Sequence, residues 1–188
     1  MLSNKKVFTQ NVILNLFQDL HLRRGFTLIE LLVVVLIIGI LAAVAVPQYK
    51  KAVYKSHYAK LKTLAASIAQ AQEVYYLANG HYATKIEELD LDMPGGKTTD
   101  STDNQYIYDW GFCAISDGAA AQVNCNNYKI DMGYQHRQAH ATTEPNSRKC
   151  QSHSLEETDI RNQICKAETG AASGKKLKSY NSISWNYQ

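Results

Sequence analysis

The sequence predicts an α+β fold in which a long N-terminal α-helix packs against a small antiparallel β-sheet. Two patterns in the chain lead to this prediction. An apolar run at residues 26–46 continues into residues 47–78, where apolar side chains recur at steps of three and four, the spacing of one helix face. After residue 79 apolar and polar side chains alternate instead, which is the period of β-strands.

The apolar run at residues 26–46 contains a single charged residue, Glu30. As a helix rising ~1.5 Å per residue it spans about 32 Å, close to the ~30 Å hydrocarbon core of a bilayer. Arg23 and Arg24 directly precede it and favour a cytoplasmic N-terminus. We therefore expect a membrane-spanning helix. A secretory signal peptide cleaved at the small residues near the end of the run is the alternative, although its apolar core is normally shorter.

Glu30 is unusual in such a helix. A carboxylate near the centre of a membrane costs about 2.5–3.5 kcal/mol, so it usually marks a pairing partner. An ordinary single-span anchor gives no reason to keep the residue. The alternative to a partner is a carboxyl group that is protonated or self-paired near the lipid headgroups.

Residues 23–30, Arg-Arg-Gly-Phe-Thr-Leu-Ile-Glu, and the apolar run that ends before Pro47 closely resemble the N-terminus of type IV pilins and the related pseudopilins. The resemblance implies that a membrane-embedded prepilin peptidase cuts between Gly25 and Phe26 and methylates the new amino group of Phe26. Residues 1–25 are then a leader, either long in its own right or read from a start codon assigned upstream of the real one. The expected cleavage point is the same in both cases.

The resemblance also implies roles in assembly for Glu30 and Pro47. The family's acidic residue at this position pairs with the terminal amine of a neighbouring subunit, so docking satisfies an otherwise uncompensated carboxylate. Pro47 removes an amide donor and crowds the carbonyl of Ala43, so it should kink or loosen the helix rather than end it. We expect residues 26–46 to form the membrane or filament-core part and residues 47–78 its amphipathic continuation.

The continuation is predicted to present an apolar face and then stop. Asn79 and Gly80 form a helix C-terminal signal. The residues expected on the apolar face are Tyr54, Tyr58, Leu61, Leu64, Ala65, Ile68, Ala71, Gln72, Tyr75 and Ala78.

Residues 79–188 are expected to form an exported head. Strands are predicted where apolar side chains alternate, and short helices where capping or helical spacing occurs. The predicted strands are 106–112, 128–134 and 183–187, the predicted turns Asp117-Gly118 and Asn126-Asn127, and the predicted short helices lie within 86–91 and from Ser154 to near Cys165.

All four cysteines, Cys113, Cys125, Cys150 and Cys165, lie in this head. Their even number and wide spacing in an exported segment favour disulfides over a metal site. Nearness in the chain favours Cys113 with Cys125 and Cys150 with Cys165, although four cysteines allow three connectivities. In related pilins a disulfide-bounded C-terminal region is exposed and variable, so the resemblance makes residues 150–165 the candidate for contact with the outside.

Signals for catalysis and metal binding are weak. His136 and His140 are four residues apart, but their strand-like surroundings argue against the helix that this spacing needs. Asp100, Asp103 and Asn104 are rich in oxygen ligands but lack the EF-hand spacing. We expect no enzymatic activity, no cofactor and no resident metal.

The formal net charge of +3 divides unevenly along the chain. Residues 1–25 alone carry +3, which leaves the rest neutral and gives no support for nucleic-acid binding. Within the rest, residues 47–78 carry five lysines against one glutamate, a net +4, whereas residues 79–188 carry 11 basic against 14 acidic residues, a net −3. This division predicts attraction between the helix of one subunit and the head of the next.

Taken together, the resemblance implies a structural subunit of a type IV pilus-like filament. Its precursor would cross the bacterial inner membrane with a cytoplasmic N-terminus, rest in lipid and then join a helical homopolymer at the cell surface. The implied partners are copies of itself, the prepilin peptidase, the inner-membrane assembly platform and minor pilins. A pseudopilin of a type II secretion system is the alternative within the family, and a membrane-anchored extracellular binding module is the alternative from another class.

Overall fold

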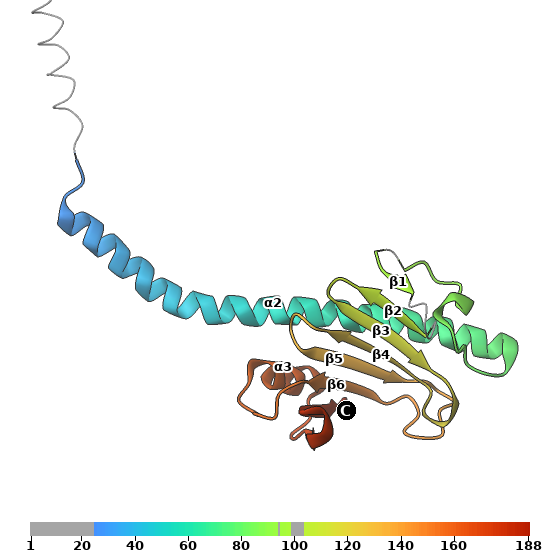
Figure 1. Cartoon of the computed structure of the whole chain (residues 1–188). Coiled ribbons are helices and arrows are strands. Elements are labelled where there is room, and N and C mark those ends of the chain that lie inside the picture. Colours follow the sequence, from blue (N-terminus) through green and yellow to red (C-terminus); the bar gives the residue numbers. More distant parts are fainter. Residues whose placement is uncertain (1–24, 94, 99–103) are drawn as a thin grey trace, which may run out of the picture. The chain divides into compact units, whose positions relative to one another are not determined.

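The computed structural model describes residues 25–93, 95–98 and 104–188. The predicted leader up to Arg24, and the Asp100 and Asp103 of the oxygen-rich loop, lie outside the described residues. The chain divides into two compact units, Met1–Pro47 and Gln48–Gln188. The second unit contains the sheet, both disulfides and the second part of the long helix (Figure 1).

The long helix α2 extends over Leu28–Asn79 and contains Pro47. It continues past the proline, as predicted from the helical spacing on both sides. It ends at the predicted stop signal, where the backbone of Gly80 has a φ of +74°. Residues other than glycine rarely adopt this conformation. The amide of Gly80 donates to the carbonyl of Tyr76 at 2.8 Å and completes the last turn.

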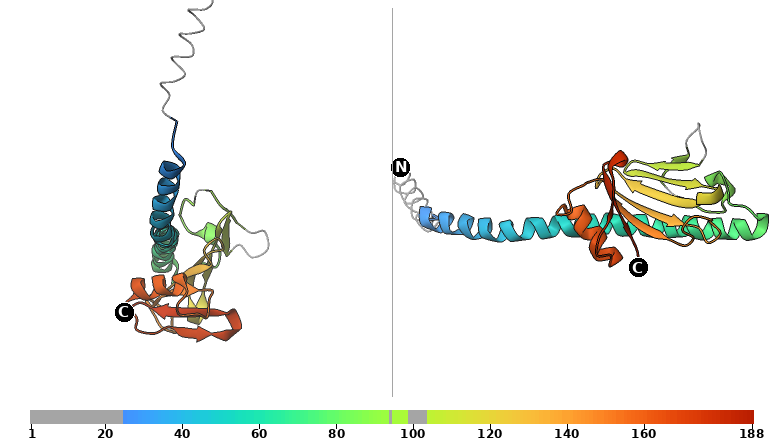
Figure 2. Two further views of the ribbon diagram at one scale, coloured as in Figure 1. Left: turned by 90° about the vertical axis from the view of Figure 1, so that its left-hand side faces the viewer. Right: turned by 90° about the horizontal axis from the view of Figure 1, so that it is seen from below.

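Residues 48–79 of α2 bury one face against the sheet (Figure 2). Ala78, predicted on this face, is exposed because the sheet does not reach the last turn. Ala69 is buried although it was not predicted. The fully buried members of the face are Tyr58, Leu61, Ala65, Ile68, Ala69 and Gln72, and the partly buried ones are Tyr54, Leu64, Ala71 and Tyr75.

The sheet has eight antiparallel strands in the order β1-β2-β3-β4-β5-β6-β8-β7. Its inner face, which points toward α2, contributes residues such as Val123, Met132 and Tyr134 to the core. The strands are β1 Lys97–Thr98, β2 Gln105–Tyr108, β3 Gly111–Ser116, β4 Gln122–Asn127, β5 Met132–Arg137, β6 Arg148–Ser152, β7 Lys175–Leu177 and β8 Ser182–Asn186. The short 3-10 helices are η1 Ile86–Glu88, η2 Gly118–Ala120 and η3 Lys178–Tyr180.

Three local predictions need correction, and one of them is the strand at 128–134, since residues 128–131 form a turn and β5 begins only at Met132. Residues 106–112 form not one strand but the β2–β3 hairpin, which turns at Asp109 and Trp110. Asn126 and Asn127 are not a turn but the end of β4, and the turn follows at Tyr128 to Asp131. Carboxamide residues are common in turns, so the two asparagines at the end of β4 indicated a turn. They hid the alternation of apolar and polar side chains that a strand would show.

The last helix, α3, extends over Ile160–Thr169 and packs against β6 and β8. The capping signal at Ser154 predicted its start too early. The N-cap is Asp159, whose carboxylate accepts from the amide of Arg161 at 2.8 Å, while the Ser154 hydroxyl accepts from Glu156 in the preceding loop. The predicted helix within residues 86–91 is the short helix η1.

The disulfides join Cys113 to Cys125 and Cys150 to Cys165. The first links the facing residues of β3 and β4, and the second fastens β6 to α3. All four cysteines lie in the core beneath the sheet. Cross-links of this loop size stabilise a small domain by roughly 3 kcal/mol in the chain-entropy model.

Gln72 is the polar member of the buried helix face. Its side chain is 1% exposed. Its amide nitrogen donates to the carbonyl of Ala83 at 3.0 Å, and its oxygen accepts from the amide of Ala83 at 2.9 Å. This pair of bonds fastens the segment after α2 back onto the helix.

Substitution Gln72→Ala is therefore expected to lower the free energy of unfolding by about 2–4 kcal/mol, because it leaves two buried backbone groups without partners. Urea unfolding of the full chain in detergent, followed by the fluorescence of Trp110 and Trp185, measures this. Gln70→Ala is the matched control, since Gln70 is an exposed glutamine on the same helix. Equal destabilisation by both substitutions would contradict the expected role of Gln72.

Candidate functional site

The start of α2 is organised by a reciprocal capping box between Thr27 and Glu30. The Thr27 amide and hydroxyl both donate to Glu30 Oε2 at 2.8 Å, and the Glu30 amide donates to the Thr27 hydroxyl at 3.2 Å. This arrangement satisfies amides that a helix start otherwise leaves without partners. Thr27 is not among the site residues predicted from the sequence, although Thr-x-x-Glu before an apolar run is the signal for this motif.

The capping box places the carboxylate of Glu30 in the first turn of the helix. Only one carboxylate oxygen, Oε2, takes part, and within the described residues Oε1 accepts no hydrogen bond. A negative charge in the first turn also interacts favourably with the positive end of the helix dipole. Glu30 is thus self-paired in the single chain and retains one oxygen for another donor.

The predicted cleavage position directly precedes this turn. Gly25, Phe26 and Thr27 lie before the first helical residue and are exposed, Phe26 to 85%. Apart from the two neighbours of Gly25 in the chain, no described residue has an atom within 4 Å of the position that a Cβ on Gly25 would occupy. The backbone between Gly25 and Phe26 is therefore open to another protein.

The apolar part of α2 is exposed on all sides of the helix. By length and composition this part can cross a membrane, and none of it is buried within the chain. Its large exposed residues are Leu28, Ile29, Leu31, Leu32, Val33, Val34, Val35, Leu36, Ile37, Ile38, Ile40, Leu41, Val44 and Val46. A surface of this kind is stable in lipid or against other apolar helices but not in water.

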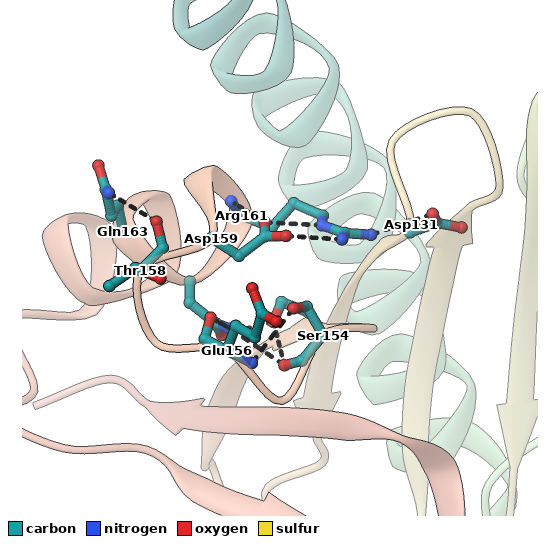
Figure 3. A network of polar contacts seen from close by, with 9 residues as sticks. Asp131, Ser154, Glu156, Thr158, Asp159, Arg161 and Gln163 are labelled. Carbon is teal, nitrogen blue, oxygen red and sulfur yellow. Dashed lines mark hydrogen bonds and ion pairs between the residues drawn. The ribbon is translucent and has the colours of Figure 1, made fainter.

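The disulfide-bounded segment 150–165 is held by Arg161 (Figure 3). Its guanidinium donates to both oxygens of Asp159, at 2.8 and 2.7 Å, and to Asp131 in the β4–β5 turn at 3.0 Å. The hydrogen bonds from Arg161 lower the pKa of Asp159 below its ordinary value. The loop before α3 is exposed at residues 156–158.

The two histidines do not form a metal site. His136 lies half-buried on β5, whereas His140 lies beyond the strand with its ring stacked on Tyr76 at 4.2 Å. In the part of the chain that the structure describes, no three His, Cys, Asp or Glu side chains gather as a metal ion would need. The strand conformation explains why the spacing of four residues does not bring the two rings together.

Comparison with known proteins connects this helix start to a family. Residues 20–46 match the family model described as the prokaryotic N-terminal methylation motif. The chain is 41% identical over 66 residues to the type IV major pilin protein PilA of Myxococcus xanthus, which is 35% of this chain and 30% of that protein. It is 43% identical over 61 residues to a fimbrial protein of Neisseria meningitidis serogroup B, which is 32% of this chain and 36% of that protein.

A third relative is the type IV major fimbrial protein FimA of Dichelobacter nodosus, 45% identical over 56 residues, which is 30% of this chain and 36% of that protein. The chain therefore spans only about a third of the length of the curated relatives it matches. No solved structure gives a significant match to the chain.

His136 makes the stability of the head depend on pH. Burial, and after it the charge of Arg148, lowers the pKa of His136 below the ordinary 6.5. The unfolded chain therefore takes up this proton more readily than the folded chain. The stability that the neutral ring contributes is complete above pH 6.5 and is lost as the pH falls through the lower folded pKa.

We expect the free energy of unfolding to be lower at about pH 5 than at about pH 7.5, and His136→Gln to reduce this difference. Urea unfolding of the full chain at the two pH values measures it. His153→Gln, at an exposed histidine, is the control. A pH dependence that is unchanged in His136→Gln would disprove the assignment.

Proposed function

Because its N-terminal helix is that of the type IV pilin family, we propose that this chain is a structural subunit of a type IV pilus-like filament. In this proposal the chain is a membrane-held precursor that loses residues 1–25 and polymerises through α2. The observation that carries the proposal is the all-round apolar surface of residues 28–46. The function is structural rather than catalytic.

The energetics of this surface support two successive environments for the helix. Each large apolar side chain gains roughly 1.5–3 kcal/mol when it is removed from water, so an exposed helix of this kind must be covered. Lipid covers it in the precursor, and the same helices of other subunits cover it in the filament. Transfer from one apolar environment to the other changes the apolar burial little, which leaves polar groups to direct assembly.

Glu30 is the polar group best placed for this role. Cleavage after Gly25 creates an amine at Phe26, and a positive charge at a helix N-terminus is unfavourable. The capping box uses Oε2 of Glu30 and leaves Oε1 for an amine. In the proposed filament this amine belongs to a neighbouring subunit, so the pairing sets the register between subunits as well as attracting them.

The proposal includes the partners and the location that the family implies. The prepilin peptidase cuts the precursor and methylates Phe26, and the inner-membrane assembly platform and minor pilins take part in polymerisation. The precursor lies in the inner membrane with its N-terminus in the cytoplasm, and the filament lies at the cell surface. The relatives reported above are major pilins and fimbrial proteins, which favours a pilus over a secretion pseudopilus.

Substitution Gly25→Val is expected to block processing, because the peptidase recognises the glycine next to the cut. The protein itself has room for the side chain, since nothing lies within 4 Å of the added Cβ. Intact mass spectrometry of membranes from cells that contain the peptidase measures the result. Wild type should show loss of residues 1–25 and one N-methyl group on Phe26, and Gly25→Val should retain the precursor mass.

Gly39→Val is the matched control for this experiment. Gly39 lies in the same apolar run and also has no atom within 4 Å of an added Cβ. It should be processed like wild type. Normal cleavage of Gly25→Val, or a mature N-terminus other than Phe26, would show that the proposed processing site is wrong.

Charge pairing and capping by Glu30 can be separated by two substitutions. Glu30→Gln retains an oxygen that accepts from Thr27 but removes the negative charge. Thr27→Ala removes the hydroxyl of the capping box, at a typical cost of ~1 kcal/mol, but retains the charge. We expect both variants to be processed, Glu30→Gln to form almost no filaments and Thr27→Ala to form filaments in reduced or normal amounts.

Electron microscopy and immunoblotting of sheared surface material measure the filaments. Processing is checked in the same cells by mass spectrometry. If Glu30→Gln assembles normally while Thr27→Ala does not, Glu30 acts by capping the helix and the pairing with a neighbouring amine is excluded.

A further inference from the structure

A hollow of about 730 Å³ opens on the outer face of the sheet, the face that points away from α2. In Figure 1 the sheet lies in front of the helix, so this outer face is turned toward the viewer. Its volume lies within the ~300–1,000 Å³ typical of small-molecule sites. The proposed filament function does not use this hollow.

Carboxamide side chains dominate the lining. The register of the strands brings them together, because Asn124 faces Gln135 across β4 and β5, and Gly133 lies between Asn126 and Gln151. Residues that face each other on one side of a sheet have side chains about 5 Å apart. The six carboxamide residues are Gln122, Asn124, Asn126, Asn127, Gln135 and Gln151.

Several of these groups have hydrogen-bonding capacity that the protein does not use. Gln135 donates to Gln122, and Asn126 donates to Asn124 at 3.0 Å. Gln135 and Asn126 are each only 8% exposed. Within the described residues, however, Gln135 Oε1 and Asn126 Oδ1 accept no hydrogen bond, and the carboxamide of Gln151 has no partner. These atoms are not among the fully buried polar atoms without a partner, so they are accessible from the hollow and available to a polar ligand.

Gly133 lies between two lining residues, Asn126 and Gln151, in the register of the strands. A Cβ on this glycine would lie 2.3 Å from Oδ1 of Asn126. The absence of a side chain therefore leaves room for the Asn126 carboxamide and for a ligand above the strand. Gly133 has an ordinary strand conformation, since it is not among the residues with positive φ, so the position is restricted by the space that Asn126 occupies and not by the backbone.

The remaining lining includes aromatic rings, and its two fixed charges each lie in an ion pair, Arg137 with Glu144 at 3.9 Å and Asp131 with Arg161 at 3.0 Å. Phe112 and Tyr128 lie with ring centroids 5.7 Å apart, and Tyr128 and Tyr180 are 63% and 71% exposed. Of the described lining residues, Arg137 and Asp131 carry fixed charges. Arg137 donates to the carbonyl of Thr143 at 3.1 Å, and Asp131 accepts from Arg161 at 3.0 Å.

We propose that this hollow binds a neutral saccharide. A carboxamide donates and accepts through adjacent atoms, which suits the neighbouring hydroxyl groups of a sugar ring. The exposed rings of Tyr128 and Tyr180 offer flat apolar surfaces on which the C–H face of a sugar can lie. The clustered carboxamides supply the hydrogen bonds, and the aromatic rim supplies the contact area.

The same features disfavour other ligands. A phosphate, sulfate or carboxylate requires unpaired cationic groups, and the arginine of the lining, Arg137, already forms an ion pair with Glu144. An apolar helix or lipid would leave the carboxamides buried without hydrogen bonds, which is costly. An extended peptide normally adds to a sheet edge, whereas this hollow lies in the middle of the sheet.

A glycan array tests the proposal with the purified full chain in a zwitterionic detergent without a sugar headgroup. The probes are maltotetraose, cellotetraose, chitotetraose, mannotetraose and lacto-N-neotetraose, next to sialylated and sulfated oligosaccharides and a Gly/Ser-rich peptide. We expect binding to at least one neutral glycan. In the variants Asn124→Ala, Gln151→Ala and Gly133→Ala its Kd should rise by about tenfold or more.

Asn186→Ala is the matched control, since Asn186 is an exposed carboxamide on β8 outside the hollow, and its Kd should equal that of wild type. Titration of the unmodified chain gives a second measurement that no folding defect affects. The side-chain amide NMR signals of Asn126 and Gln135 should shift, and that of Asn186 should not. No binding to any neutral glycan, a preference for charged glycans or the peptide, or binding unaffected by the three substitutions would overturn the proposal.

Discussion

The contact between one face of α2 and the inner face of the sheet is the constraint on which the head depends. Leu61, Ala65 and Ile68 are completely buried in it. At roughly 1.5–3 kcal/mol for each large apolar side chain, this face contributes more than any single polar contact in the head. The small residues Ala65 and Ala69 allow the strands to lie close to the helix, and Gln72 extends the contact to the segment that follows. The same helix remains uncovered before Pro47, so one element connects the folding of the head to the need for a partner.

Because the inner face of the sheet supplies the hydrophobic core, the side chains on the outer face are not needed to form that core. Val123 and Cys125 of β4 point to the core, while the alternating Gln122, Asn124 and Asn126 form a polar surface. Such carboxamides add little to stability, and within the described residues the side-chain oxygens of Gln135 and Asn126 accept no hydrogen bond and are accessible from the hollow. A surface that only needed to be soluble would contain charged residues that remain in water. The selection of neutral carboxamides around Gly133 is therefore better explained by a ligand than by the fold.

The sequence predicts the helical part of the structure well and the sheet only in part. Continuous apolar character before Pro47 and regular spacing after it defined α2, because both patterns extend over many consecutive residues. The strands β4 and β6 were missed because their outer residues are polar carboxamides or charged residues and their inner residues are few, so alternation was not visible. The resemblance identified Glu30 but not Thr27, since a capping box depends on a local backbone geometry that the family pattern did not mention. The lining of the outer hollow comes from six strands, β3 to β8, and no local pattern in the sequence contains the register that brings them together.

The positions of the lysines in the helix change the prediction that the helix of one subunit attracts the head of the next. The net charges of +4 in residues 47–78 and −3 in residues 79–188 suggest attraction between neighbouring subunits. Two of the five lysines, however, already interact within their own head: Lys62 bonds to Glu168 at 2.5 Å, and Lys60 lies 5.1 Å from the centre of the Trp110 ring. Lys50, Lys51 and Lys55 have no such partner among the described residues, and they lie just after Pro47, where the apolar run ends. Since exposed charges are screened beyond about 8 Å at physiological ionic strength, any attraction between subunits must come from these three lysines and from acidic groups that the filament brings close to them.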